Sequence, residues 1–236
     1  MTILTTTYNC ENYIEKCLYS LMSQSFKEFK CFITDDLSTD NTVKKIKSII
    51  EGDSRFVLVQ NTTKLFQPGN YDNIIRNYIK DDQEICVEVD GDDWLVNSKV
   101  LEKINEIYTM EDVWCTSGSF RYSDGRPGFA TPPTTFDNIR KQTFTLSHLR
   151  TWKAWLWKKI EQSDLIDNNG QYWEVAGDLS FMYPMVEMSG TNHFKFMRDI
   201  LYIYNETNPL NDHKVNMEKV LKTVKIIRDK VPYEQL

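Results

Sequence analysis

The first ninety residues alternate between short apolar segments and segments whose apolar side chains recur at helical spacing. Strand-like runs occupy residues 3–6, 29–34, 56–59 and 85–89, and helical patterns lie between them, near residues 13–22, 43–50 and 74–79. A helix after each strand carries the chain back to the same edge of a sheet, so such strands pair in parallel. The order predicts an α/β fold with a mostly parallel sheet of the nucleotide-binding type.

The rest of the chain mixes helical and strand patterns without a Pro-, Gly- or Ser-rich linker. We expect helices at residues 100–108 and 148–160, from Asp178 onward, and at 212–229, strands at 113–122 and 194–204, and a long loop at 123–137. A loop of that length inside a compact domain is usually functional or mobile. We interpret the 236 residues as one domain with a specialised second half.

The composition is that of a globular protein without affinity for nucleic acid. Hydrophobic residues make up 41% and aromatic residues 13% of the chain, which is enough to fill a core. A net charge of −6 and the lack of a long Lys/Arg run exclude nucleic acid as a partner. No signal-peptide pattern or membrane-spanning apolar run occurs, so we expect a soluble, cytoplasmic protein. The five cysteines form no CxxC pair and are expected to be reduced core thiols.

A group of carboxylates follows directly on the apolar strand pattern that ends at Val89. Asp90, Asp92 and Asp93 surround Gly91 at the point where an open α/β sheet places its ligand crevice. Like charges this close repel one another, and a divalent cation relieves that repulsion. Hard oxygen ligands suit Mn²⁺ or Mg²⁺ shared with the phosphates of a substrate. The alternative is a solvated Asp-Gly turn in which Asp92 or Asp93 caps the next helix.

Four short motifs stand at the ends of expected strands or helices: Thr7-Tyr8-Asn9, Gln24-Ser25, Asp35-Asp36-x-Ser38-Thr39-Asp40-Asn41-Thr42, and Asp90-x-Asp92-Asp93. In this order they resemble the motifs of the family 2 glycosyltransferases of GT-A fold. The resemblance implies a GT-A (Rossmann-like) sheet flanked by helices with a C-terminal helical extension. Residues 1–205 would form the GT-A domain, with a nucleotide-sugar-binding half at 1–100 and an acceptor-side half at 101–205, and residues 206–236 a lid or helical extension.

The activity that this resemblance implies is inverting sugar transfer from a nucleoside diphosphate sugar, with a UDP-sugar favoured and Mn²⁺ or Mg²⁺ as cofactor. The acceptor is a hydroxyl of a glycan, a glycoconjugate or another molecule, as in polysaccharide biosynthesis. A lipid-linked acceptor would require peripheral docking at a membrane, and the C-terminal helix could form a homodimer contact. Two alternatives are a degenerate module that binds a nucleotide sugar without transferring it, and a sugar nucleotidyltransferase. The nucleotidyltransferase would need a Gly-rich, basic loop, which residues 7–11 do not form.

The resemblance also assigns roles to single residues on the donor side. Positions that bind the nucleotide sugar correspond to Thr7, Tyr8, Asn9, Asp35, Asp36, Arg76, Asp90, Gly91 and Asp92. Among these, Thr7 and Tyr8 would line the base, and Asp36 with Asp35 would bind the base or ribose, although both aspartates could instead cap a helix. Arg76 would reach the base or diphosphate. Asp92 and Asp90 correspond to metal-site residues, and His213 to a metal ligand on a C-terminal lid.

On the acceptor side, Asp178 corresponds to the general base that takes the proton of the attacking hydroxyl. Its alternative role is that of an ordinary N-cap at the start of a helix. Glu174 is the second choice of base, and Trp173 could stack on the acceptor sugar or belong to the core. Asp93 would lie behind the metal ligands. His148 and Arg150 could face the site, with Arg150 against a phosphate or the acceptor, or could be buried structural residues.

Overall fold

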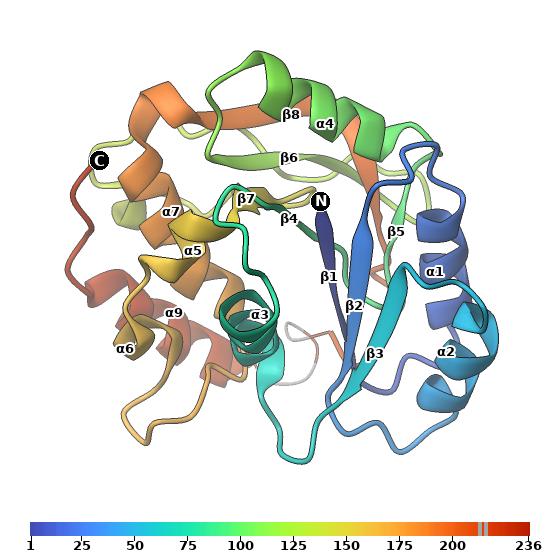
Figure 1. Ribbon diagram of the computed structural model, residues 1–236. Helices are drawn as coiled ribbons and strands as arrows, with labels where there is room; N and C mark the ends of the chain where they lie inside the picture. Colours follow the sequence, from blue (N-terminus) through green and yellow to red (C-terminus); the bar gives the residue numbers. More distant parts are fainter. Residues whose placement is uncertain (212–213, 215–216) are drawn as a thin grey trace.

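One twisted sheet runs through the protein, and its first half is parallel (Figure 1). The computed structural model describes residues 1–211, 214 and 217–236. Within these residues the sheet has eight strands in the order β3-β2-β1-β4-β7-β6-β8-β5. Strands β1 (Thr2–Thr7), β2 (Lys30–Asp35), β3 (Phe56–Gln60) and β4 (Ile85–Glu88) pair in parallel. Helices α1 (Ile14–Met22), α2 (Thr42–Ile50) and α3 (Phe66–Asn77) connect them. The predicted α/β fold with a mostly parallel sheet is confirmed.

The second half extends the sheet with mixed pairing. It contains β5 (Trp94–Leu95), β6 (Cys115–Tyr122), β7 (Thr151–Lys153) and β8 (Phe194–Tyr204). The helical elements are α4 (Val100–Met110), the 3-10 turn η1 (Ile139–Lys141), α5 (Ala154–Lys158), α6 (Gln162–Leu165), α7 (Gly177–His193) and α9 (Met217–Asp229). Strand β7 pairs antiparallel with both β4 and β6, so it joins the parallel half to the rest of the sheet.

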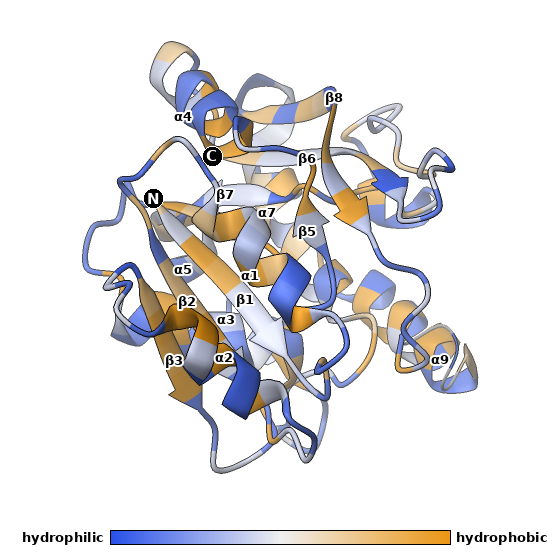
Figure 2. Cartoon of the chain, turned by 90° about the vertical axis from the view of Figure 1, so that its right-hand side faces the viewer, coloured by the Kyte–Doolittle hydropathy of each residue, from blue (hydrophilic) through white to orange (hydrophobic). Residues whose placement is uncertain are grey.

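Strands β1, β2 and β4 are buried on both faces, to which successive side chains point in alternation. Leu4 and Phe32 pack in one apolar cluster with residues of α3, α5 and α7. Ile3 and Ile33 pack in a second cluster with residues of α1 and α4. Figure 2 shows hydrophobic colouring along the strands, whereas helices such as α4 carry both hydrophobic and hydrophilic residues. This burial on two sides accounts for the nearly continuous apolar patterns of these strands.

The expected aromatic helix at residues 148–160 is wrong in its first half. Residues 151–153 form β7, and only residues 154–158 are helical. Trp152 lies opposite Cys86 of β4 and Cys115 of β6, and its ring stacks on Trp157 with the centroids 5.5 Å apart. Pairing on both sides in the sheet therefore overrides the local helical spacing of the aromatic residues. Trp152 and Trp157 are fully buried, so both rings belong to the core.

The cysteines, the bounds of two helices and the search for membrane spans can also be compared with the sequence-based predictions. All five cysteines are free and buried, which confirms the core thiols. The helix expected near residues 74–79 begins earlier, at Phe66, and the described part of the last helix begins at Met217. The search for membrane spans in the described part of the chain found no helix with the length and apolar character to cross a bilayer.

A buried ion pair attaches the C-terminal helix to the rest of the domain. The Arg140 guanidinium contacts the Glu187 carboxylate of α7 at 2.6 Å and donates to the carbonyl oxygens of Ile227 and Lys230 at the end of α9. Arg140 keeps only 4% of its side chain exposed. Because both charges are out of water, each depends on the other for compensation.

We expect Arg140→Met to lower the free energy of unfolding by about 3–5 kcal/mol, since it leaves the Glu187 carboxylate buried without a partner. Arg126→Met is the matched control, because Arg126 also forms ion pairs, with Asp124 and Glu206, but keeps 58% of its side chain exposed. Urea unfolding of the two variants and the parent protein measures the difference. Equal, small losses in both variants would contradict the role given to the buried pair.

Candidate functional site

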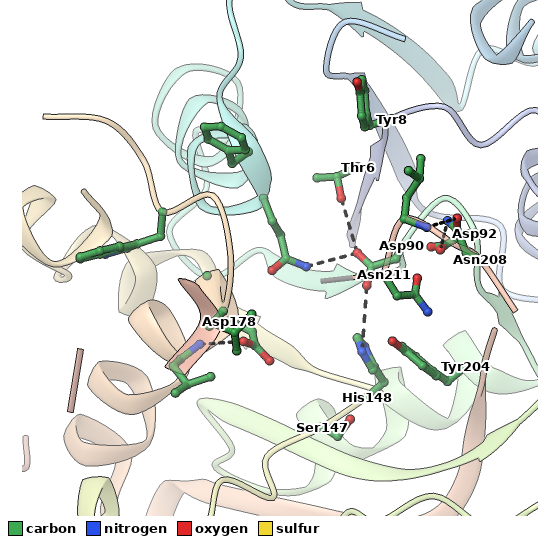
Figure 3. Close-up of a pocket in the computed structure, with 18 of the residues that line it drawn as sticks. Thr6, Tyr8, Asp90, Asp92, Ser147, His148, Asp178, Tyr204, Asn208 and Asn211 are labelled. Carbon is green, nitrogen blue, oxygen red and sulfur yellow. Dashed lines mark hydrogen bonds and ion pairs between the residues drawn. The ribbon is translucent and has the colours of Figure 1, made fainter. Parts of the chain in front are cut away.

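The carboxyl ends of the parallel strands meet at one edge of the sheet, where they border a cavity of about 750 Å³ (Figure 3). Thr7 at the end of β1, Asp36 after β2 and Asp90 after β4 all line this cavity. The opposite wall comes from residues 173–179 at the start of α7 and from α9. Parallel pairing brings together side chains that are more than eighty residues apart in the sequence, as the ends of such strands are expected to do.

Asp36 organises the entrance to α3. Its carboxylate accepts hydrogen bonds from the backbone N–H groups of Leu65 and Phe66, both at 2.9 Å, and from Asn61 Nδ2 at 2.8 Å. Asp36 therefore caps a helix, as its alternative role predicted. The helix is α3, which follows β3, and not α2, which comes next after Asp36. Asp35 closes the turn after β2 by accepting from the Ser38 N–H at 3.1 Å, and it is not among the cavity-lining residues. The binding of a base or ribose by Asp35 and Asp36 stays a prediction.

Two residues of the Thr7-Tyr8-Asn9 motif line the cavity, and the third does not. Thr7 and Tyr8 line the cavity, and Tyr8 keeps 42% of its surface exposed. The Lys64 ammonium lies 2.9 Å from the centroid of the Tyr8 ring. Asn9 points elsewhere, because its Oδ1 accepts from the Thr39 N–H at 2.8 Å. Asn9 thus ties the loops after β1 and β2 together, outside the cavity lining.

Gly91 allows the segment that carries Asp90, Asp92 and Asp93 to lie close to β1. Its N–H donates to the Thr6 carbonyl at 3.0 Å. A Cβ atom built on Gly91 would lie 2.5 Å from Thr7 Cγ2 and 2.9 Å from the Thr6 carbonyl oxygen. Any other residue would therefore force the two motifs apart.

Asp90 and Asp92 both line the cavity, from neighbouring positions. Asp90 Oδ1 accepts from Gln67 Nε2 at 3.3 Å, and Asp92 Oδ2 accepts from Asn208 Nδ2 at 2.7 Å. Burial, followed by repulsion from Asp92, raises the pKa of Asp90 to about 6. Burial also raises the pKa of Asp92. The two carboxylates therefore hold negative charge at a cost that a cation would relieve.

Asp93 serves a different purpose. It is 1% exposed, and its Oδ1 accepts from the Asn205 backbone N–H at 2.6 Å, which fixes the chain just after β8. The cap of the following helix is instead Gln24, whose Oε1 accepts from the Leu101 N–H at 3.1 Å. The capping alternative is therefore wrong for Asp93.

Glu88 is a carboxylate of this site that we did not select from the sequence. It is fully buried, its Oε1 contacts Arg150 Nη1 at 2.7 Å, and its Oε2 has no hydrogen-bond partner. Burial is the main cause that raises its pKa to about 8, against the lowering effect of Arg150. A glutamate within the apolar run of residues 85–89 was the available signal, because a central strand rarely buries an acidic side chain without a partner.

His148 lies beside these carboxylates. Its ring stacks on Tyr202 with centroids 4.5 Å apart, and its Nε2 is 4.0 Å from Asp90 Oδ2. Burial and then the Arg150 charge lower the pKa of His148 well below its usual value, so the ring is neutral and able to bind a metal. Among the described residues, Glu88, Asp90 and His148 form a group whose ligand atoms all lie within 4.8 Å of one another.

Arg150 connects this group to Asp178 across the cavity. Its Nη2 contacts Asp178 Oδ2 at 2.6 Å, while its Nη1 holds Glu88. Asp178 lies in the first turn of α7, and 23% of its side chain is exposed. The residue that caps this helix is Ala176, so Asp178 is not the N-cap. Figure 3 shows Asp178 and the Asp90–His148 pair on opposite sides of the cavity.

The remaining acceptor-side residues also line the cavity. Trp173 is 6% exposed, and its Nε1 donates to the Asp164 carbonyl at 2.8 Å, so most of the ring belongs to the core. Glu174 forms an ion pair with Lys219 of α9. Asp178, in contrast, contacts Arg150, which also binds Glu88 close to Asp90.

The structure does not bring Arg76 to the cavity, and His213 lies outside the described residues. Arg76 contacts Asp72 at 2.6 Å and donates to the Ile160 carbonyl at 3.0 Å. Helix α3 begins at the cavity edge with Phe66 and runs away from it, which puts Arg76 about 15 Å along the axis at 1.5 Å per residue. The expectation that Arg76 reaches the base or diphosphate is therefore wrong.

Comparisons with known proteins agree with this architecture. A family profile described as Glycosyl transferase family 2 matches residues 2–165. An uncharacterized glycosyltransferase of Haemophilus influenzae is 26% identical over 127 residues, which cover 52% of this chain and 48% of that protein. The UDP-Glc:alpha-D-GlcNAc-diphosphoundecaprenol beta-1,3-glucosyltransferase WfaP of Escherichia coli is 31% identical over 114 residues, which cover 47% of this chain and 41% of that protein. The chain thus spans less than half the length of these curated relatives.

Solved structures show the same fold. Staphylococcus aureus TarS 1–349 in complex with UDP-GlcNAc matches with a TM-score of 0.72 and 20% identity, over 96% of this chain and 64% of that one. The mannosyltransferase PcManGT from Pyrobaculum calidifontis, in complex with GDP-Man and Mn²⁺, matches with a TM-score of 0.65 and 18% identity, over 98% of this chain and 65% of that one.

Glu88 makes the stability of the metal-free protein depend on pH. The folded protein keeps the Glu88 proton up to about pH 8, whereas the unfolded chain releases it near the ordinary value of 4.5. Between these values the folded state binds more protons, so the free energy of unfolding falls as the pH rises.

We expect Glu88→Gln, which stays neutral, to reduce this fall between pH 5 and pH 8 in urea unfolding. Glu102→Gln on the exposed side of α4 is the control, and it should follow the parent protein. Parallel curves for the parent protein and Glu88→Gln would contradict the raised pKa of Glu88.

Proposed function

The chain belongs to glycosyltransferase family 2, and from that premise we propose that it transfers a sugar from a nucleoside diphosphate sugar to an acceptor hydroxyl, with inversion and with a divalent cation. The observation that carries the proposal is the arrangement around one cavity. Asp90 and Asp92 lie at the carboxyl edge of the sheet, and Asp178 faces them through Arg150. An attacking hydroxyl and a departing diphosphate need groups of these kinds on opposite sides of a sugar.

The donor side of the cavity suits a nucleotide. Thr7 and Tyr8 offer a hydroxyl and an exposed ring at the end of β1, and the Asp36 carboxylate lies next to them. Lys64, which lies over the Tyr8 ring, brings a positive charge to the same edge. Solved neighbours hold UDP-GlcNAc or GDP-Man, and the Escherichia coli relative is named for UDP-Glc, which together support a nucleotide sugar. We favour a UDP-sugar.

Asp90 and Asp92 are the residues that we propose to hold the cation. Both offer hard carboxylate oxygens to one cavity, and both carry raised pKa values that a cation would offset. The neighbour crystallised with Mn²⁺ supports a divalent ion, either Mn²⁺ or Mg²⁺. When bound, the ion neutralises charge on the departing nucleoside diphosphate. His213 remains our proposal for a further ligand.

Asp178 is the residue that we propose as general base. Its carboxylate is partly exposed to the cavity and is held in place by Arg150 Nη2 at 2.6 Å. It can accept the proton of an acceptor hydroxyl as the oxygen attacks the sugar. Glu174 is the weaker choice, because its carboxylate pairs with Lys219 of α9 and not with Arg150, so Arg150 does not connect it to the carboxylates after β4.

The segment after Asn205 supports the proposed division into a domain at residues 1–205 and a lid or extension at residues 206–236. Glu206, Asn208, Leu210 and Asn211 line the cavity, and Asn208 reaches Asp92. We propose a glycan or glycoconjugate as the acceptor, and a soluble protein that meets it in the cytoplasm.

Calorimetric titration with UDP, GDP, CDP and dTDP, with and without Mn²⁺, tests the donor site first. Tight, Mn²⁺-dependent binding of one nucleotide is the expected result and would identify the base. No binding of any nucleotide would overturn the proposal.

Asp92→Asn should abolish the Mn²⁺-dependent part of nucleotide binding, because it removes the negative charge that holds the cation. Asp199→Asn serves as the control, since Asp199 is exposed and lies outside the cavity. Calorimetry of both variants measures the effect. Unchanged metal-dependent binding in Asp92→Asn would rule out the assigned ligand.

Asp178→Asn should bind the nucleotide with Mn²⁺ as tightly as the parent protein but lose at least about a hundredfold in the rate of sugar release from the donor, the usual contribution of a positioned base. Glu174→Gln should lose much less, because Glu174 pairs with Lys219 on α9 and not with Arg150. Release of nucleoside diphosphate from the matching nucleotide sugar gives the rate. Equal rates in the parent protein and Asp178→Asn would remove Asp178 from the chemistry.

A further inference from the structure

The wall of the cavity farthest from the aspartate group is apolar and carries one positive charge. Leu179 of α7 and Phe144 contribute apolar side chains there. Val220, Val224 and Arg228 of α9 recur every four residues, so they share one stripe of that helix. All three are half-buried, whereas Thr223 and Ile227 on the adjacent stripe are buried in the domain. The helix therefore presents two valines and a guanidinium to the cavity.

Arg228 is the cavity cation that has no carboxylate partner in the described part of the chain. Lys64 lies 3.9 Å from Asp36, and Arg150 pairs with both Glu88 and Asp178. Arg228 forms no ion pair with a described residue, and the Nε of its half-buried side chain has no hydrogen-bond partner. A guanidinium whose charge no carboxylate neutralises attracts an anion from the cavity, and charge-assisted hydrogen bonds would hold that anion.

Tyr183 of α7 is a neighbour of Arg228. Its side chain is 0% exposed, and burial raises the pKa of its hydroxyl, while the charge of Arg228 and a hydrogen bond from it lower that pKa. Arg228 therefore lies against α7, the helix that carries the proposed base Asp178 in its first turn.

We propose that Arg228 binds an anionic group of the acceptor, a phosphate or diphosphate ester, and that Val220, Val224 and Phe144 contact an apolar part attached to it. A guanidinium binds phosphate oxygens through two parallel hydrogen bonds, and the valine stripe can take only an apolar group. The inference rests on the proposed function, because it concerns the acceptor of the same reaction. The Escherichia coli relative, named for a diphosphoundecaprenol-linked acceptor, is consistent with this chemistry.

Geranyl diphosphate is a probe that carries both features, and geraniol and inorganic diphosphate each carry one of them. The titrations are made by calorimetry with Mn²⁺ and the nucleotide selected by the donor screen already bound, so that the donor site is filled. We expect geranyl diphosphate to bind more tightly than either simpler probe. Failure of every nucleotide to bind would overturn both the proposed function and this inference before any probe is added.

Arg228→Gln should weaken the binding of geranyl diphosphate about tenfold or more, as expected for the loss of charge-assisted hydrogen bonds, and leave geraniol unchanged. Arg198→Gln is the matched control, because Arg198 is exposed and lies outside the cavity. Arg228→Lys keeps the charge and should lose less than Arg228→Gln. With the nucleotide still bound, equal affinity in the parent protein and Arg228→Gln would overturn the inference alone.

The apolar part of the proposal has its own variant. Val224→Thr keeps the volume of the side chain but adds a hydroxyl, so it should weaken geranyl diphosphate and leave inorganic diphosphate unchanged. If inorganic diphosphate binds as tightly as geranyl diphosphate in the parent protein, the apolar contact is overturned. A loss in Arg198→Gln equal to that in Arg228→Gln would show a general charge effect and would overturn the role of Arg228.

Discussion

The concentration of buried carboxyl groups at the end of β4 is the constraint on which the rest of the site depends. Glu88, Asp90, Asp92 and Asp93 fall within six residues, and all have raised pKa values. Within the described residues, the buried cation that contacts this group is Arg150, which binds Glu88 directly. Its second pair of hydrogen-bond donors then reaches Asp178. Compensation of one buried carboxylate thereby also sets the position of another that faces the cavity.

The sequence was sufficient to predict the parallel half of the fold. Alternation of apolar strands with amphipathic helices is a local pattern, and the polar residues after β1, β2 and β4 had to meet because parallel strands end at one edge. Asp36, Asp90 and Asp92 could be selected for the same reason. Gln24, chosen only as part of a motif, proves to cap α4 and so to join it to the end of α1.

The features that the sequence did not predict depend on contacts between distant segments. Strand β7 forms because residues 151–153 pair on both sides in the sheet, which no local spacing reveals. Glu88 needs Arg150, sixty-two positions further along the chain, before its burial makes sense. Arg76 was selected by motif alone, and the start of α3 at Phe66 determines that it lies far from the cavity. Arg228 likewise gains its place from the docking of α9 on α7 through Arg140.

The hydrogen bond from Asn208 to Asp92 links the C-terminal segment to the proposed metal site. The two oxygens of the Asp92 carboxylate offer about four lone-pair sites, so the amide N–H of Asn208 can fix the orientation of the carboxylate and still leave room for a cation. Because Asn208 follows β8 by four residues, the path of the chain after this strand and the orientation of the proposed metal ligand are set together. A rearrangement of this segment would therefore change the geometry that Asp92 offers to a cation.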